Sequence, residues 1–210
     1  MLRMLTVAVL LALAGPVLAH PHGWIDMQSR VLFDGDGRIT GLRQVWLFDE
    51  LYSAFILDEI RLAGEGEEEG LAALAHEDVA ALAPHDYFTV VEVAGERQAF
   101  APVTRYDNGL TDGRIWLRFD LPLAAPVEPQ RREVRYAVFD PTYYIEILHV
   151  GDPPVRLDAP GADACGFRLI EPEPAAEIVN FAAALDMNAT DDAGLGRHFA
   201  QWVELACTAP

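Results

Sequence analysis

The residues best suited to chemistry lie close together near residue 20. His20, His22 and Asp26 alternate with Ile25 and Met27. Because successive side chains of a strand point to opposite faces, we expect the three polar side chains to share one face. Imidazole nitrogens favour zinc, copper or nickel over oxygen-seeking cations. The spacing predicts a candidate metal site, and the alternative is a fraying strand start whose histidines are simply exposed.

The first 19 residues have the organisation of a cleavable secretory signal peptide. Arg3 makes the start positive, residues 5–13 are apolar, and residues 17–19 place small or modest side chains at a cleavage site. The apolar stretch is shorter than the ~20 residues that span a bilayer. We therefore expect a signal peptide at 1–19 and a single periplasmic domain at 20–210 that does not itself span the membrane.

Cleavage after residue 19 would give His20 a free α-amine. The amine and Nδ1 of that residue can chelate one metal ion, and an unperturbed amine pKa near ~7.7–8 lets a metal displace the proton at little cost. Pro21 has no backbone N–H, which excludes a planar chelate built on deprotonated amides. The expected nitrogen ligands are then the amine and the imidazoles.

One further histidine could reach this site, because His149 ends an apolar strand. The remaining histidines are scattered, and neither a His-Glu-x-x-His motif nor a zinc-finger spacing is present. The expected cofactor is a transition metal ion: zinc, nickel or copper. The expected metal ligands are His20, His22, Asp26 and His149.

The sequence offers little for catalysis. It contains no Gly-x-Ser-x-Gly elbow, phosphate loop or dinucleotide fingerprint. Asp49 and Glu50 would diverge on a helix, and Asp49 is better explained as a helix N-terminal residue. The net charge of −18 argues against nucleic acid and anionic lipid as partners. We do not expect an enzyme.

Two cysteines, Cys165 and Cys207, predict one structural disulfide. An exported chain folds in an oxidising compartment, and an even count leaves no odd thiol. Closing a loop of about 40 residues would stabilise the fold by roughly 4 kcal/mol. The alternatives are a thiolate metal site or a redox pair, and no Cys-x-x-Cys spacing supports the latter.

Short strands separated by turn residues predict an α+β, mostly β fold, with an antiparallel β-sandwich-like domain. A first hairpin is expected at 20–33 and 38–48. A two-helix insertion should follow it, at 49–62 and 71–82, around a solvated acidic linker. The later expected elements are strands at 88–93, 98–104, 114–121, 133–139, 143–150 and 155–157, a helix at 175–185 and a final segment at 199–207.

Four motifs follow one another along the chain: His20 to Asp26, Trp46 to Ser53, Phe139 to Ile145, and Gly196 to Ala200 running on to Cys207 with Cys165 before it. Together and in this order they resemble the domain-of-unknown-function family 1007, over essentially all of residues 20–210. Members of that family are described as periplasmic components of uncharacterised ABC-type transport systems, often linked to nickel/cobalt or zinc permeases. Gly23 departs from the family pattern, in which a bulkier residue is common.

The resemblance implies metal handling. It suggests a periplasmic accessory protein of nickel/cobalt or zinc transport that holds metal at His20 and His22 and exchanges it with a metal permease at the inner membrane. The alternative is a metal-free interaction module that docks on a membrane permease or envelope complex, with Trp24 and residues 140–144 as its contact surface or core. A copper oxidase with a terminal-histidine site would need a third nitrogen that the sequence does not identify.

Overall fold

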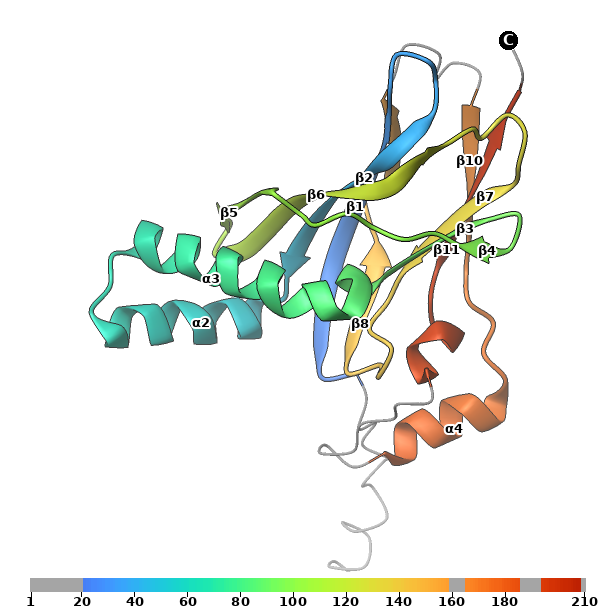
Figure 1. Cartoon of the computed structure of the whole chain (residues 1–210). Coiled ribbons are helices and arrows are strands. Elements are labelled where there is room, and N and C mark those ends of the chain that lie inside the picture. Colours follow the sequence, from blue (N-terminus) through green and yellow to red (C-terminus); the bar gives the residue numbers. More distant parts are fainter. Residues whose placement is uncertain (1–20, 159–164, 186–193, 209–210) are drawn as a thin grey trace, which may run out of the picture.

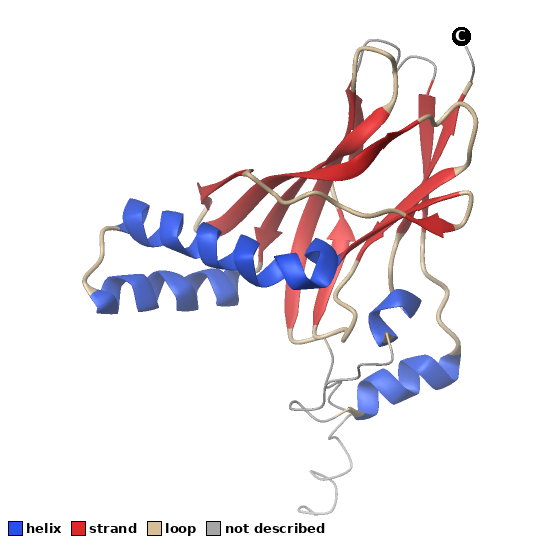
Figure 2. Ribbon diagram, viewed as in Figure 1, coloured by secondary structure: helices blue, strands red, loops and turns tan. Residues whose placement is uncertain are grey.

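The computed structural model describes residues 21–158, 165–185 and 194–208 (Figure 1). Two β-sheets share a core, and a pair of helices projects from one side of them (Figure 2). The expected α+β, mostly β sandwich is therefore confirmed. The expected signal peptide, its cleavage site and His20 lie outside the described residues. None of the helices within the described ranges is long and apolar enough to cross a membrane.

The first sheet is mixed, whereas the sequence predicted a purely antiparallel arrangement. Its central strand β1 (Gly23–Phe33) pairs antiparallel with β2 but parallel with both β8 and β9. Parallel partners so distant in the chain are joined by long connections, which local patterns do not reveal. The remaining strands of this sheet are β2 (Ile39–Phe48), β5 (Arg105–Thr111), β6 (Arg114–Val127), β8 (Ile145–His149) and β9 (Val155–Asp158), in the order β5-β6-β2-β1-β8 with β9 also beside β1.

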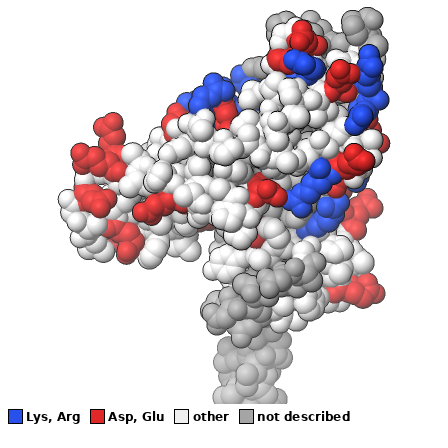
Figure 3. Space-filling view, in the orientation of Figure 1, with Lys and Arg blue, Asp and Glu red and all other residues white. Residues whose placement is uncertain are grey.

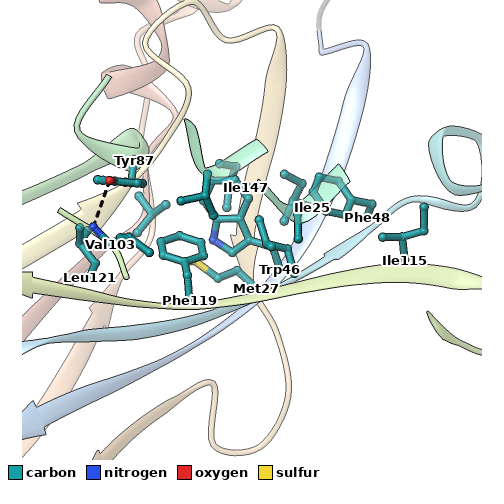
Figure 4. Close-up of a cluster of buried hydrophobic side chains, with 14 of the residues drawn as sticks. Ile25, Met27, Trp46, Phe48, Tyr87, Val103, Ile115, Phe119, Leu121 and Ile147 are labelled. Atoms are coloured by element: carbon teal, nitrogen blue, oxygen red, sulfur yellow. Dashed lines mark hydrogen bonds between the residues drawn. The ribbon is translucent and has the colours of Figure 1, made fainter. Parts of the chain in front are cut away.

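Alternation along β1 and β2 decides which side chains enter the core. Ile25 and Met27 are at most 2% exposed, while Trp24 and Asp26 point to the other face. Figure 4 shows the inward side chains of β1 meeting Trp46 and other large apolar groups. The Trp46 indole N–H donates to Gln44 Oε1 at 2.9 Å, so this buried polar group is satisfied.

The second sheet carries the disulfide. Cys165 and Cys207 are register partners on its two neighbouring strands, and they form the expected bond. This sheet closes a core against the first, with Val91, Tyr136 and Val203 in the same apolar cluster as residues of β1 and β2. Its strands, in spatial order, are β10 (Cys165–Ile170), β11 (Trp202–Cys207), β7 (Val134–Val138), β3 (Thr89–Val93) and β4 (Glu96–Arg97).

The two-helix insertion forms a hairpin of α2 (Glu50–Ala63) and α3 (Glu67–Leu82) that stands out from the sheets (Figure 1). Asp49 is the N-cap of α2, as expected, and Gly64 ends that helix with a left-handed φ of 78°. Helix α3 begins four residues earlier than predicted. The glutamates expected in a solvated linker form its first turn, where negative charge is favourable.

Three other expectations about elements need correction. Residues 98–104 are not a strand, although they contain the isolated bridge between Phe100 and Leu123 and donate or accept a few other backbone hydrogen bonds. Strand β5 occupies residues between two expected strands, where no strand was expected, and β10 was not expected. The remaining elements are η1 (Ala83–Phe88), α4 (Ala176–Ala184) and η3 (Leu195–His198).

Candidate functional site

A cleft of about 620 Å³ lies where the α2–α3 hairpin meets the beginnings of β1 and β8. A volume of this size lies in the range of small-molecule sites, about 300–1,000 Å³. Most of its wall is apolar. The sheet contributes Trp24, Trp46 and Phe48, and the hairpin contributes Leu51, Phe55 and Leu82.

The rim of this cleft exposes large apolar side chains. Leu51 and Phe55, one turn apart on α2, are 81% and 62% exposed, and Trp24 and Tyr144 across the opening are 49% and 44% exposed. Isolated exposed apolar residues are ordinary, but a group of them around a cavity is typical of a binding site. The rim and the cleft thus form one continuous apolar surface.

Hydrogen bonds hold the hairpin against the sheet, so the cleft is preformed. The Asp49 carboxylate accepts from Tyr52 N at 2.8 Å and from Trp24 N at 3.2 Å, which ties the first turn of α2 to β1. One turn later the buried Ser53 hydroxyl accepts from Ile115 N of β6 at 3.0 Å. Both contacts lie at the root of the hairpin and fix the direction of α2.

Asp78 is the unusual polar group of the cleft. Its Oδ2 is buried and makes no hydrogen bond to any described residue. Burial, helped by the charge of Glu77, raises the pKa of Asp78 to about 6. Burial and the nearby carboxylates of Asp78 and Asp49 raise the pKa of Tyr52 to about 12. The cleft therefore contains a carboxyl group that titrates near neutral pH and a phenol that stays protonated.

Of the predicted metal ligands, His22 lines this cleft. Its backbone N–H donates to Tyr144 O at 2.8 Å, and the two rings lie 4.8 Å apart. Asp26 is engaged elsewhere, because its Oδ2 accepts from Arg114 Nη1 at 2.8 Å. Arg114 also donates to Phe48 O at 2.6 Å, so the ion pair joins β1 to β2 and β6.

His149 is not brought to this site. In the parallel pairing of β8 with β1 it lies opposite Met27, on the inward face, and it is 8% exposed. Its Nε2 is 3.1 Å from Ser29 Oγ, which is 2.6 Å from Tyr136 OH. Burial lowers the pKa of His149 to about 4. His149 is thus on the opposite side of β1 from Asp26, and the expected four ligands do not form one set.

Among the described residues, no three His, Cys, Asp or Glu side chains are grouped so that they could hold a metal ion. His20 lies outside the described residues. A metal site built on His22 would therefore need ligands from before residue 21.

The corner at residues 140–144 positions one rim residue. The buried Asp140 carboxylate accepts from the backbone N–H groups of Thr142, Tyr144 and Ile145, at 2.9–3.0 Å. Tyr143 turns inward, where its ring stacks on Phe199 at 3.9 Å. Tyr144 turns outward to the cleft. The hydrogen bonds of Asp140 thus fix the backbone of this corner so that Tyr144 faces the cleft and Tyr143 is buried.

Sequence reasoning missed Asp78, although a signal was present. Leu71, Ala75, Asp78 and Leu82 follow one another at helical spacing, and the other three members are apolar. A carboxylate in an otherwise apolar stripe is expensive to bury, which makes it a candidate for function. Phe55 gave no comparable signal, because an exposed apolar residue on a helix is common.

The protein is a two-sheet β-sandwich with an apolar cleft between the first sheet and the inserted helical hairpin. The chain belongs to the family described as "Protein of unknown function (DUF1007)", which matches residues 5–207. It is also 27% identical over 194 residues to an uncharacterized protein of Haemophilus influenzae, an alignment that covers 91% of this chain and 92% of that protein. The expected family membership is confirmed.

Proposed function

We propose that this protein is a periplasmic binding protein that takes a largely apolar ligand into the cleft between the α2–α3 hairpin and the first sheet. The observation that carries the proposal is the cleft itself: about 620 Å³, mostly apolar, and continuous with the exposed side chains of Trp24, Phe55 and Tyr144. The periplasmic location rests on the signal-peptide pattern of residues 1–19.

The hydrogen bonds at the root of the hairpin support this proposal. A preformed site loses less conformational freedom on binding than one that must assemble around its ligand. Because Asp49 and Ser53 fix α2 in place, the apolar wall is available before the ligand arrives. Transfer of apolar ligand surface into the cleft then supplies the driving force, at roughly 25 cal/mol per Å².

The test is binding of the uncharged fluorophore N-phenyl-1-naphthylamine to the purified protein. Ala81 lines the cleft and Ala80, its exposed neighbour on the same helix, does not. We expect saturable binding at one site, at least about tenfold weaker in Ala81→Phe and unchanged in Ala80→Phe. Equal binding by both variants, or none by the wild type, would remove the cleft as a ligand site.

A second function, accessory binding of a transition metal for exchange with an inner-membrane permease, is favoured by the place of His22. The His22 ring lines the cleft. The Asp49 carboxylate lies beside the following residue, Gly23, because a Cβ added to Gly23 would be 3.9 Å from Asp49 Oδ2. In this proposal His20 supplies its amine and imidazole.

Calorimetric titration of zinc, nickel and copper tests the metal proposal. An added alanine before His20 should weaken binding at least about tenfold, because it separates the α-amine from the ring. His22→Ala should do the same, while the exposed His198 serves as the control position for His→Ala. Unchanged affinity in a double His20→Ala, His22→Ala variant would end this second proposal.

A further inference from the structure

We infer that the ligand of the cleft is an amphiphilic organic cation, an apolar body that carries a protonated amine, and that the amine pairs with Asp78. This inference rests on the proposed function and names the chemical class of the ligand. It follows from three features of the cleft: a carboxylate oxygen without a donor, the absence of arginine and lysine from the described residues that line it, and an aromatic wall.

One oxygen of the Asp78 carboxylate has no hydrogen-bond donor among the residues that the structure describes. Its Oδ2 is buried at the cleft and no described residue donates to it. A buried carboxylate without a partner is unfavourable, and a charged donor relieves that cost far better than a neutral one. The Asp49 carboxylate differs, because both of its oxygens already accept backbone N–H groups. Asp78 is therefore the group that a ligand would satisfy.

The charges around the cleft favour a cation. Among the described residues that line it, none is an arginine or a lysine, while Asp49 and Asp78 both contribute carboxylates. Figure 3 shows acidic side chains gathered at the outer end of the α2–α3 hairpin in this view, and basic ones over the strands. With a net charge of −18, the protein attracts cations and repels an anionic amphiphile.

Aromatic rings form a large part of the wall. The faces of Trp, Tyr and Phe attract an organic cation and also pack against its apolar body. Tyr52 lines the same cleft and stays protonated, so its hydroxyl oxygen adds an uncharged acceptor to the wall. The rings that line the cleft include Trp24, Trp46, Phe48, Tyr52, Phe55 and Tyr144.

The test compares three ligands with the same eight-carbon chain. Octylammonium, octanol and octanoate are each used at pH 8 to displace N-phenyl-1-naphthylamine from the purified protein. We expect octylammonium to bind at least about tenfold more tightly than octanol, and octanoate more weakly than octanol. Asp78→Asn should abolish the preference for octylammonium and leave octanol binding within about twofold. The exposed Glu59, on α2 outside the cleft, gives the matched control Glu59→Gln, which should keep the preference.

The outcomes separate this inference from the proposed function. If octanol binds and octylammonium binds no better, or if Asp78→Asn keeps the preference, the cation inference is overturned and the apolar cleft stands. If none of the three displaces the fluorophore and the fluorophore does not bind, both are overturned. Preference for octylammonium that disappears only in Asp78→Asn supports both.

Discussion

Replacing Asp78 by asparagine should stabilise the protein at neutral and alkaline pH. The pKa of this carboxyl group rises from 3.8 to about 6 on folding, because it is buried. A rise of roughly 2 units, at 1.36 kcal/mol per unit, corresponds to about 3 kcal/mol of lost stability once the group is ionised in both states. Asparagine keeps the shape and removes the charge, so Asp78→Asn should recover most of that loss.

The sign of the pH dependence follows from the raised pKa. Between about pH 4 and 6 the folded state holds a proton on Asp78 that the unfolded state has released, so wild-type stability falls as pH rises through this window. The advantage of Asp78→Asn should therefore be largest above about pH 7 and disappear near pH 4. Other carboxylates contribute equally to both proteins and cancel in the difference.

Urea unfolding of both proteins at pH 4, 6 and 8 measures this difference. We expect Asp78→Asn to exceed the wild type by about 2–3 kcal/mol at pH 8 and by almost nothing at pH 4. A constant difference across this range would show that the charge of Asp78 is not the cause. A variant less stable than the wild type at pH 8 would refute the claim that Asp78 is buried without a partner.

Three further predictions concern residues outside the cleft. Burial holds the pKa of His149 near 4, so wild-type stability should lose about 3 kcal/mol from this group as pH falls from 6.5 to 4, and His149→Gln should remove that component of the urea-unfolding profile. Gly196→Ala should destabilise by roughly 3 kcal/mol in the same assay, because its Cβ would collide with a backbone carbonyl, whereas Gly166→Ala, with open space around it, should change stability by less than about 0.5 kcal/mol. Thiol labelling of the denatured, unreduced protein should find Cys165 and Cys207 blocked, and their joint replacement by alanine should cost up to about 4 kcal/mol; two labelled thiols would contradict the disulfide.

The titrations of Asp78 and His149 oppose each other in the wild type. As pH falls from about 6 to 4, proton uptake by Asp78 favours the folded state and the unprotonated His149 disfavours it. The wild-type profile should therefore be flatter than that of either single variant. Between about pH 4 and 6, the pH profiles of unfolding free energy of the two single variants should slope in opposite directions. The profile of the wild type alone would not reveal these two opposing contributions.

Local sequence patterns predicted many of the strands and helices. Strand alternation identified Ile25 and Met27 as inward-facing, and helical spacing with an N-terminal Asp49 located α2 to within one residue at each end. These elements are determined by their own periodicity. The disulfide between the two cysteines was predictable because an exported chain folds in an oxidising compartment and an even number of cysteines leaves no odd thiol.

Strand β5 could not be predicted because its turn-like residues are needed for packing. Asp107 forms an ion pair with Arg118 of the neighbouring strand. Gly109 leaves room for an aromatic ring, since a Cβ there would lie 2.8 Å from Trp116 Cζ2. Asp, Asn and Gly normally indicate a turn. Cross-strand contacts override that preference here, and they are invisible in a single segment.

The metal hypothesis placed His149 incorrectly in space for a reason of topology. Its position at the end of an apolar strand was predicted correctly, since His149 is the last residue of β8. The neighbour was not foreseeable, because the parallel pairing with β1 aligns His149 with Met27 and not with Asp26. The cleft could not be predicted either, because it forms only where the α2–α3 hairpin packs against the first sheet. Asp78 lines the cleft for the same reason.

The most direct test of the cleft as a binding site is a crystal structure of the protein with octylammonium. We expect the alkyl chain against Trp24, Phe55 and Tyr144, and the nitrogen about 2.7–2.9 Å from a carboxylate oxygen of Asp78, the distance of a charge-assisted hydrogen bond. An empty cleft at saturating ligand, or octylammonium bound only elsewhere on the protein, would contradict the proposal.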